Sequence, residues 1–193
     1  MTTNPTFYIT TPIYYVNDIP HIGHAYTTLA CDVMARFKRL DGFDVMFLTG
    51  TDEHGQKVEK SAAAKGKTPI ELCDEVSQRF RDLVKFMNFS NDDFIRTTEE
   101  RHKIACQALW KKIEESGNIY LDKYSGWYSV RDEAYYAESE LQEGAGGEKL
   151  APTGAPVEWV EEESYFFKLS AWEDSLLEWY EKLPETVLPK PKK

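Results

Sequence analysis

Long apolar runs are absent from this sequence. No stretch approaches the roughly 18–20 apolar residues that a membrane-spanning helix needs. Residues 1–5 lack the basic region followed by an apolar core that marks a secretory signal. We therefore expect a cytoplasmic protein that has no membrane partner.

Cysteine is scarce too: the 193 residues include only Cys31, Cys73 and Cys106. Their odd number and wide spacing argue against a disulfide framework and against a four-ligand zinc site. We expect all three to be small buried apolar residues in a reducing compartment.

Positive charge is in short supply, since 23 Lys and Arg stand against 33 Asp and Glu, a net charge of −10. The deficit is concentrated in residues 132–185, which hold 15 acidic and 3 basic residues. An acidic surface is poorly suited to coating a polyphosphate. If a nucleic acid binds, this segment is not expected to supply most of the phosphate contacts.

The residues that are present have the composition of a globular protein, with 41% hydrophobic and 29% charged residues. Through residue 117 the pattern alternates short buried strands with helices, which predicts a doubly wound α/β sheet. The expected strands are residues 7–11, 43–48 and 92–96, and the expected helices are residues 21–40, 56–65, 68–87 and 97–117.

Two of these helices carry further signals. The sequence Thr-Pro-Ile-Glu at residues 68–71 has the form of a capping box with proline at the first helical position. The last helix has apolar residues at helical spacing and is expected to turn Ile104, Ala108, Leu109 and Ile113 inward.

The chain changes character after residue 117. Short aromatic runs are broken by turn residues, and the glycine-rich residues 143–148 predict a flexible loop. We interpret residues 1–117 as a nucleotide-binding half-domain and residues 118–170 as a small β-rich insertion. Residues 171–193 are expected to form a helix followed by a frayed tail.

The most informative stretch is His21-Ile22-Gly23-His24, in the first turn of a predicted helix. A helix N-terminus offers unpaired N–H groups and a positive dipole end, which suits a phosphate. Gly23 lacks the Cβ that would keep a ligand off the backbone, and the two imidazoles can donate to phosphate oxygens. Taken alone, such a motif is more often a pair of solvated surface histidines than a phosphate site.

A second polar segment, residues 49–55, follows the expected strand at residues 43–48. Ligands bind past the carboxyl ends of parallel strands, so we expect this segment to lie near His-Ile-Gly-His. Asp52 fits the N-cap of the following helix on local grounds. His54 fits a structural role in the loop or a contact to a nucleotide equally well.

Two runs together carry a resemblance to a known family. FYITTPIYYVNDIPHIGH (residues 7–24) and LTGTDEHG (residues 48–55) closely resemble the class I aminoacyl-tRNA synthetases, and among these the methionyl-tRNA synthetases. WYSVRDEAYY (residues 127–136) is similar to the start of that family's connective insertion. The resemblance implies the first half of a doubly wound Rossmann-like parallel sheet with a small β-rich connective insertion.

The resemblance also implies roles for particular residues. It makes His21, Gly23 and His24 the ATP-binding segment, with the two histidines catalytic. It gives Asp52 the task of holding the α-ammonium of methionine, which a carboxylate does through a charge-assisted hydrogen bond.

Ile13 and Tyr15 match positions that line the methionine side-chain pocket in this family, where an aromatic ring suits a sulfur atom. On the sequence alone, plain core packing is the favoured explanation for both. Tyr14 is expected to face the other side of the segment.

The implied substrates and partners are ATP with Mg²⁺, methionine, and tRNA. Many members carry Cys-x-x-Cys zinc knuckles in the insertion, but no cysteine follows Cys106, so zinc is not expected. The family's second half-sheet, Lys-Met-Ser-Lys-Ser loop and anticodon-binding domain are not found in this sequence. We expect an amino-terminal part of a methionine–tRNA ligase, inactive alone, with the missing carboxyl-terminal half as a candidate partner.

Two other functions stay open. One is a nucleotidyltransferase, a class that also uses His-x-Gly-His, although the setting of Tyr15 and Asp52 and the β-rich insertion speak against it. The other is a non-catalytic ATP- or amino-acid-binding module that keeps the fold without the chemistry.

Overall fold

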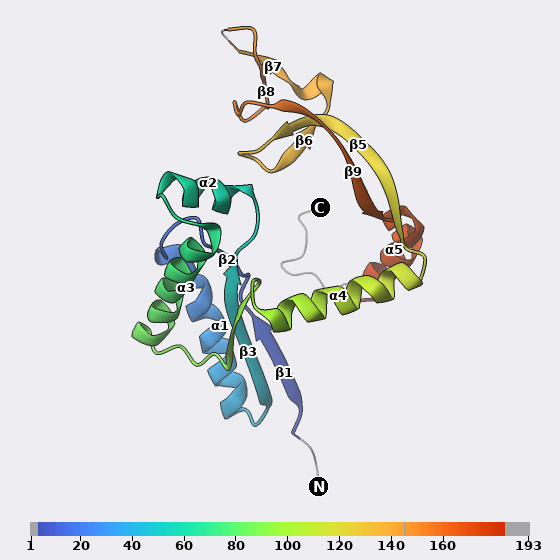
Figure 1. The fold of residues 1–193 in the computed structure, drawn as a ribbon. Coiled ribbons are helices and arrows are strands. Elements are labelled where there is room, and N and C mark those ends of the chain that lie inside the picture. The colour runs from blue at the N-terminus through green and yellow to red at the C-terminus, as the bar shows by residue number, and fades with distance from the viewer. Residues whose placement is uncertain (1–3, 145, 184–193) are drawn as a thin grey trace. The chain divides into compact units, whose positions relative to one another are not determined.

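The structure, a computed structural model, describes residues 4–144 and 146–183. It divides into two compact units, residues 1–106 and residues 107–193, both drawn in Figure 1. The division falls within helix α4 (Glu100–Glu115). None of the described helices has both the length and the apolar character that a bilayer crossing requires.

A parallel four-stranded sheet forms the first unit. Its strands are β1 (Thr6–Thr10), β2 (Tyr14–Tyr15), β3 (Asp44–Asp52) and β4 (Asp93–Arg96). β1 and β2 pair with one side of β3, and β4 pairs with the other side. Leu48 is paired with both Thr10 and Asp93, and Thr51 is paired with both Tyr14 and Arg96. All pairings are parallel, which confirms the predicted α/β class.

Three helices accompany this sheet: α1 (Ile22–Leu40), α2 (Gln56–Ala64) and α3 (Pro69–Phe86). α1 contacts β1 and β3, α3 contacts β3 and α2, and Figure 1 shows α1 and α3 running along the sheet. Buried apolar side chains from β2 and the turn that follows it, and from α2, α3 and β4, form the core of the unit. They are Tyr14, Val16, Val58, Ala62, Leu72, Cys73, Val76, Phe80 and Phe94.

α3 begins with the predicted capping box. Thr68 Oγ1 accepts a hydrogen bond from the N–H of Glu71, and the Glu71 carboxylate accepts one from the N–H of Thr68 at 2.8 Å. Pro69 takes the first helical position, where a missing N–H leaves no hydrogen bond unmade. Capping depends on neighbours within four residues, which is why the sequence shows it directly.

α1 packs against the unit through a polar face. Its buried residues are Thr28, Asp32 and Ala35. The Asp32 carboxylate accepts hydrogen bonds from the N–H and the hydroxyl of Ser90, each at 2.6 Å, and from Arg36 Nε at 2.7 Å. Burial alone would raise the pKa of Asp32, but these hydrogen bonds outweigh it and lower the pKa.

The apolar residues of α1 at helical spacing are mostly exposed. No described residue covers this stripe enough to bury any of its large side chains. The exposed members are Tyr26, Leu29, Val33, Met34, Phe37 and Leu40.

β3 is longer than predicted. The sequence indicated a strand ending at Leu48 and a polar loop from Thr49, but the strand continues to Asp52. Thr49 and Thr51 are buried, and the hydroxyls of Thr49 and Thr11 lie 2.7 Å apart. A β-branched side chain favours a strand, and its hydroxyl can be buried once it finds a partner.

The prediction that α4 turns Ile104, Ala108, Leu109 and Ile113 inward is wrong. No residue of α4 is buried, and Ile104 and Leu109 are 58% and 60% exposed. Helical periodicity identifies an apolar face, but it does not identify what covers that face.

The three cysteines do not share one environment, contrary to the prediction. Cys73 is buried, Cys31 is half-buried, and Cys106 is exposed with its Sγ 3.3 Å from His102 Nε2. Burial, followed by the negative charge of Glu53, raises the pKa of Cys73 to about 11. Only Cys73 therefore fits the expected buried apolar role.

A long antiparallel ribbon dominates the second unit. β5 (Ile119–Ser129) pairs with β9 (Glu158–Phe167), and β6 (Ala134–Tyr136) pairs with the other edge of β5. Tyr120 and the aromatic run at residues 124–128, which are separate pieces in the sequence, thus belong to one strand of 11 residues. Trp127 and Trp159 pack edge to face across the ribbon, with ring centroids 5.4 Å apart.

The glycine-rich stretch that was predicted to be a flexible loop lies between two paired strands, and its residue 145 is outside the described residues. It joins β7 (Gln142–Glu143) to β8 (Lys149–Leu150). The N–H of Gly144 donates to the carbonyl of Glu148 at 2.8 Å, and the N–H of Gly147 donates to the carbonyl of Gly144.

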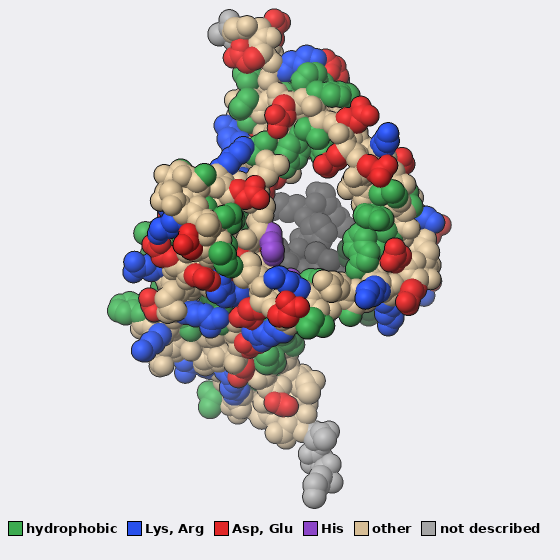
Figure 2. Space-filling model, viewed as in Figure 1, with side chains coloured by type: hydrophobic (Ala, Val, Ile, Leu, Met, Phe, Trp, Pro, Cys, Tyr) green, Lys and Arg blue, Asp and Glu red, His purple; other side chains and the backbone are tan. Residues whose placement is uncertain are grey.

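The remaining elements are short. They are the 3₁₀ segments η1 (Glu138–Glu140) and η2 (Leu169–Trp172) and the helix α5 (Glu173–Lys182). No residue of α5 is buried, and Figure 2 shows apolar side chains, in green, gathered over it. The expected tail at residues 184–193 lies outside the described residues. All five tryptophans belong to this unit: Trp110, Trp127, Trp159, Trp172 and Trp179.

Candidate functional site

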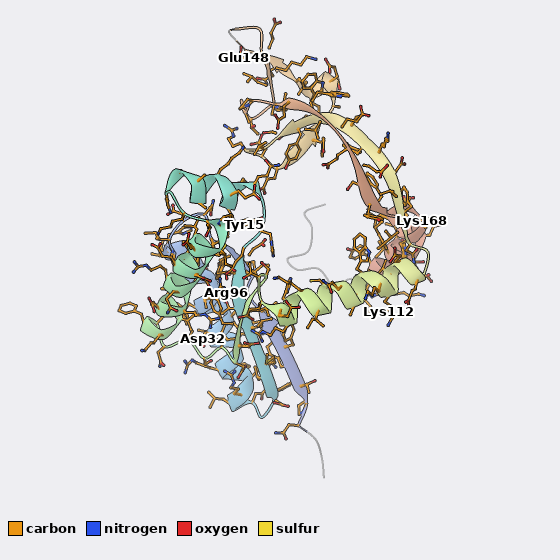
Figure 3. The ribbon with its side chains drawn as sticks, in the orientation of Figure 1. Tyr15, Asp32, Arg96, Lys112, Glu148 and Lys168 are labelled. Atoms are coloured by element: carbon orange, nitrogen blue, oxygen red, sulfur yellow. The ribbon has the colours of Figure 1, made fainter. Side chains whose placement is uncertain are left out.

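The candidate site lies at the carboxyl ends of the strands in the first unit. β2 leads into the segment that opens α1, and β3 leads into the turn that opens α2, so both predicted motifs reach the same edge of the sheet. A pocket of about 390 Å³ lies there, and its lining includes Ile13, Tyr15, His21 and His24. Figure 3 labels Tyr15 at this end of the sheet. The structure thus brings together four of the residues predicted from the sequence.

His21 and His24 cap the N-terminus of α1. His21 Nδ1 accepts a hydrogen bond from the N–H of Gly23, and His24 Nδ1 accepts one from the N–H of His21, each at 3.1 Å. Their ring centroids are 3.9 Å apart. A neutral imidazole that accepts at Nδ1 carries its proton on Nε2, so each ring presents an N–H donor at its far end.

A side chain at position 23 would crowd this cap. A Cβ on residue 23 would lie 2.9 Å from Cε1 of His21, closer than two such carbons approach. The glycine therefore leaves room for the His21 ring above the first turn of the helix.

His24 is held in its neutral form. Its ring lies 4.7 Å from that of Tyr14 and 5.1 Å from that of Phe80, measured between centroids. Burial, followed by the charge of His21, lowers the pKa of His24 below its ordinary value of 6.5. At neutral pH the ring is an uncharged hydrogen-bond donor.

Tyr14 and Tyr15 face opposite sides of β2, as predicted. Tyr14 is buried, stacks on Phe80 and shares a hydrogen bond of 2.9 Å with the hydroxyl of Thr28. Burial raises the pKa of Tyr14, and its hydrogen bond to Thr28 only partly opposes this. Tyr15 and Ile13 are 54% and 38% exposed and line the pocket, so core packing does not account for them.

Asp52 is the last residue of β3 and is paired in register with Tyr15 on β2. It is half-buried and does not belong to the set of residues that lines the pocket. The N-cap of α2 is Gly55, so the N-cap role considered for Asp52 is wrong.

Glu53 and Arg96 were missed by the sequence reasoning. The Glu53 side chain has no exposed surface, and its Oε1 accepts a hydrogen bond from Arg96 Nε at 2.7 Å. No local pattern in residues 92–96 (Asp-Asp-Phe-Ile-Arg) indicates this pair, because the two residues are 43 positions apart in the sequence. His54 makes a further contact between the two segments, since its Nε2 lies 3.2 Å from the carbonyl oxygen of Thr97.

In the part of the chain that the structure describes, no group of three or more His, Cys, Asp or Glu side chains is arranged to hold a metal ion. The chemistry available at the pocket is instead that of hydrogen-bond donors at a helix N-terminus, with a carboxylate and an aromatic ring nearby.

The chain is similar to known synthetases over nearly its whole length. It is 63% identical over 186 residues to a methionine–tRNA ligase of Rickettsia bellii, which covers 96% of this chain and 36% of the relative. It is 57% identical over 183 residues to the methionine–tRNA ligase of Rhizobium meliloti, with 95% and 36% covered. The chain thus spans about a third of the length of these curated relatives.

Solved structures give the same picture. Methionyl-tRNA synthetase of Mycobacterium tuberculosis in complex with methionyl-adenylate matches with a TM-score of 0.89 and 50% identity, over 97% of this chain and 37% of that one. The free form of the same synthetase matches with a TM-score of 0.73 and 45% identity. The resemblance noted in the sequence is confirmed. A family model described as tRNA synthetases class I (M) matches residues 7–193, and the chain belongs to this family.

Proposed function

We propose that this chain is the methionine- and ATP-binding part of a methionine–tRNA ligase. The whole enzyme would activate methionine with ATP to methionyl-adenylate and then transfer it to tRNA. One observation carries the proposal: the capped start of α1 and the Tyr15–Asp52 pair meet at one sheet edge. They do so in a chain 50% identical to a synthetase solved with methionyl-adenylate.

Activation requires the methionine carboxylate to attack the α-phosphorus of ATP while negative charge builds on phosphate oxygens. Donors held in place before the reaction stabilise that charge most effectively. We assign this role to the Nε2–H groups of His21 and His24, with the backbone at Gly23 allowing close approach. These three residues form the proposed ATP-binding segment.

The proposed methionine subsite lies beside it. Asp52 would hold the α-ammonium by a charge-assisted hydrogen bond. Ile13 and Tyr15 would contact the thioether side chain, where the ring of Tyr15 suits the sulfur atom.

Mg²⁺ would enter with ATP, coordinated by phosphate oxygens and water, because Mg²⁺ is usually bound through substrate phosphates rather than by an all-protein cage. No zinc is proposed, since no cysteine follows Cys106. We propose tRNA as a partner whose phosphates are contacted mostly by other parts of the enzyme, because residues 132–185 are strongly acidic. We propose a cytoplasmic location for the enzyme.

We propose residues 1–117 as the nucleotide-binding half-domain and residues 118–170 as the connective insertion. The parallel sheet before α4 and the antiparallel ribbon of β5 and β9 support this division. The carboxyl-terminal half of such an enzyme is the proposed partner of the chain. Full aminoacylation is not expected from the chain by itself.

Ligand binding followed by NMR tests the function on the chain as it stands. Adding methionine is expected to shift the amide signals of Ile13, Tyr15 and Asp52, and adding ATP those of His21 and His24. Asp52→Asn should weaken methionine binding about tenfold, the usual loss for a charge-assisted hydrogen bond. Asp41→Asn, at the far end of α1, is the control and should leave binding unchanged.

Methionine-dependent exchange between ATP and pyrophosphate then measures activation. Binding without exchange would place the catalytic groups beyond this chain. A folded chain whose signals respond to neither ligand would contradict the proposal. Equal responses to methionine and to other amino acids would remove the methionine assignment.

A further inference from the structure

Two neighbouring carboxylates of the site lie in different environments. Asp52 is half-buried at the end of β3, whereas the Glu53 side chain has no exposed surface. A buried carboxylate is costly unless its charge is paired and its oxygens accept hydrogen bonds. An apolar residue would pack at this position without that cost, so the charge of Glu53 calls for an explanation.

The contacts of Glu53 fix both its side chain and its main chain. Oε1 accepts hydrogen bonds from Arg96 Nε and from the Thr51 hydroxyl, each at 2.7 Å. Oε2 accepts one from the Thr98 hydroxyl, and the N–H of Glu53 donates to Thr97 Oγ1 at 2.9 Å. The residue is therefore tied to the end of β4 and to the turn that follows it.

Arg96 extends this anchor to a third element. It is the last residue of β4, labelled in Figure 3, and its Nη2 donates to Asp74 Oδ1 of α3 at 2.6 Å. Its hydrogen bond to Glu53, ahead of the one to Asp74, raises the pKa of Arg96, which keeps the guanidinium charged. The pair joins β3, β4 and α3 by bonds of defined direction.

The pairing register of the strands shows how this anchor orients the side chain of Asp52. Successive side chains of an extended strand point to opposite faces, and residues paired across strands share a face. Tyr14 and Thr51 are paired and both buried, whereas Tyr15 and Asp52 are paired and both more open. Fixing Glu53 on the buried face therefore holds Asp52 on the face of Tyr15.

Charge pairing strengthens the same anchor. The buried Glu53 carboxylate is paired with the Arg96 guanidinium, whose Nε lies 2.7 Å from Oε1, so its charge is compensated where water is excluded. We propose that the Glu53–Arg96 ion pair positions Asp52 to bind the ammonium group of the amino-acid substrate. Both are positioning residues, and this inference rests on the proposed function.

The test compares methionine with 4-(methylsulfanyl)butanoate, which differs only by lacking the ammonium. The ratio of their dissociation constants for the chain, obtained by NMR titration, isolates what the ammonium contributes. A partial loss of folded protein affects both ligands equally and leaves the ratio unchanged. We expect the native chain to prefer methionine by about tenfold or more, and Glu53→Gln to reduce this to about threefold or less.

Three further variants complete the design. Arg96→Lys keeps the positive charge but cannot bridge Glu53 and Asp74, so it should also lower the ratio; it serves as the test if Glu53→Gln does not fold. Asp52→Asn should abolish the preference. Asp32→Asn is the matched control, because Asp32 is a similarly buried, hydrogen-bonded carboxylate of the same unit, remote from the pocket. It should cost stability and keep the ratio.

The outcomes separate this inference from the function on which it rests. A native chain with no preference for the ammonium would contradict both. A preference that is lost in Asp52→Asn but retained in Glu53→Gln and in Arg96→Lys would overturn the positioning role alone.

Discussion

His21 and His24 each perform a structural task with one ring nitrogen and leave the other for a ligand. The Nδ1 atoms close the N-terminus of α1, which satisfies N–H groups that every helix start leaves open. The same hydrogen bonds fix the rings and place the protons on Nε2. The same two side chains can therefore cap the helix and make the proposed phosphate contacts.

The titration of His24 tests this description at the scale of a single residue. Burial, and then the charge of His21, lowers its pKa, so we expect its NMR titration midpoint below 6.5. Replacing His21 by Asn, a good N-cap, should raise the midpoint by removing the second cause and leave the effect of burial. An unchanged midpoint in His21→Asn would show that the charge of His21 has no part in it.

The sign of the linked stability change follows from this shift. The unfolded chain binds a proton at His24 near pH 6.5, and the folded chain binds it only at lower pH. This residue's contribution is therefore complete above pH 6.5 and is lost as the pH falls through that value towards the folded pKa. Urea midpoints between pH 7.5 and pH 5 should decline less steeply in His24→Gln.

At the scale of single elements, the capping box of α3 is a local stabilising device. Thr68→Ala removes the side-chain acceptor for the N–H of Glu71 and is expected to lower the free energy of unfolding by about 1 kcal/mol. The measurement is urea unfolding followed by far-ultraviolet circular dichroism. Ser61→Ala inside α2 is the control; it also removes a hydroxyl from a helix, but alanine favours a helix interior, so stability should not fall.

The Thr68 backbone N–H also lowers the pKa of Glu71 below its ordinary value of 4.5. The contribution of this carboxylate is complete above pH 4.5 and is lost as the pH falls through the lower folded value. Glu71→Gln removes the titrating carboxylate, and a cost of this substitution that stays the same from pH 7 to pH 3 would contradict this coupling.

The exposed apolar stripe of α1 leads to a second prediction at the scale of single elements. Val33 is 59% exposed and Ala35 is fully buried on the same helix. Val33→Lys should lower the binding of an apolar dye and leave the unfolding midpoint nearly unchanged, because the lysine reaches water. Ala35→Lys should unfold the first unit, since it buries an unpaired charge. Equal losses of stability in the two variants would show that the stripe is covered in solution.

The sequence indicated where the elements of the first unit lie better than it indicated what they contact. The helix beginning at His21 and the capping box at Thr68 were predictable because periodicity and capping act over a few neighbouring residues. The buried face of α1 was not, because Thr28 and Asp32 are held by hydrogen bonds that carry no hydrophobic signal. The extension of β3 was hidden for the same reason.

The site was predictable in part. Ile13, Tyr15, His21 and His24 lie within twelve residues of one another, so one contiguous run identified them. Glu53 and Arg96 are separated by 43 residues, and only the pairing of β3 with β4 brings them together. A single sequence contains no direct signal for a contact of that kind.

At the scale of the whole molecule, the two units differ in how their strands find each other. The sheet of the first unit needs parallel pairings, in which each strand is joined to its neighbour through an intervening helix. The ribbon of the second unit joins Ile119 to Phe167, a pairing that spans most of that unit. Both depend on contacts distant in sequence, which favours slow folding over the rapid folding of helical bundles.

The placement of the tryptophans gives the two units different optical properties. All five indoles lie after residue 106, and the aromatic rings that line the pocket at the start of α1 belong to tyrosine and histidine. Indole emission therefore reports on the folding of the second unit. A tryptophan introduced in place of Tyr8, an exposed residue of β1, would give the first unit its own fluorescent signal.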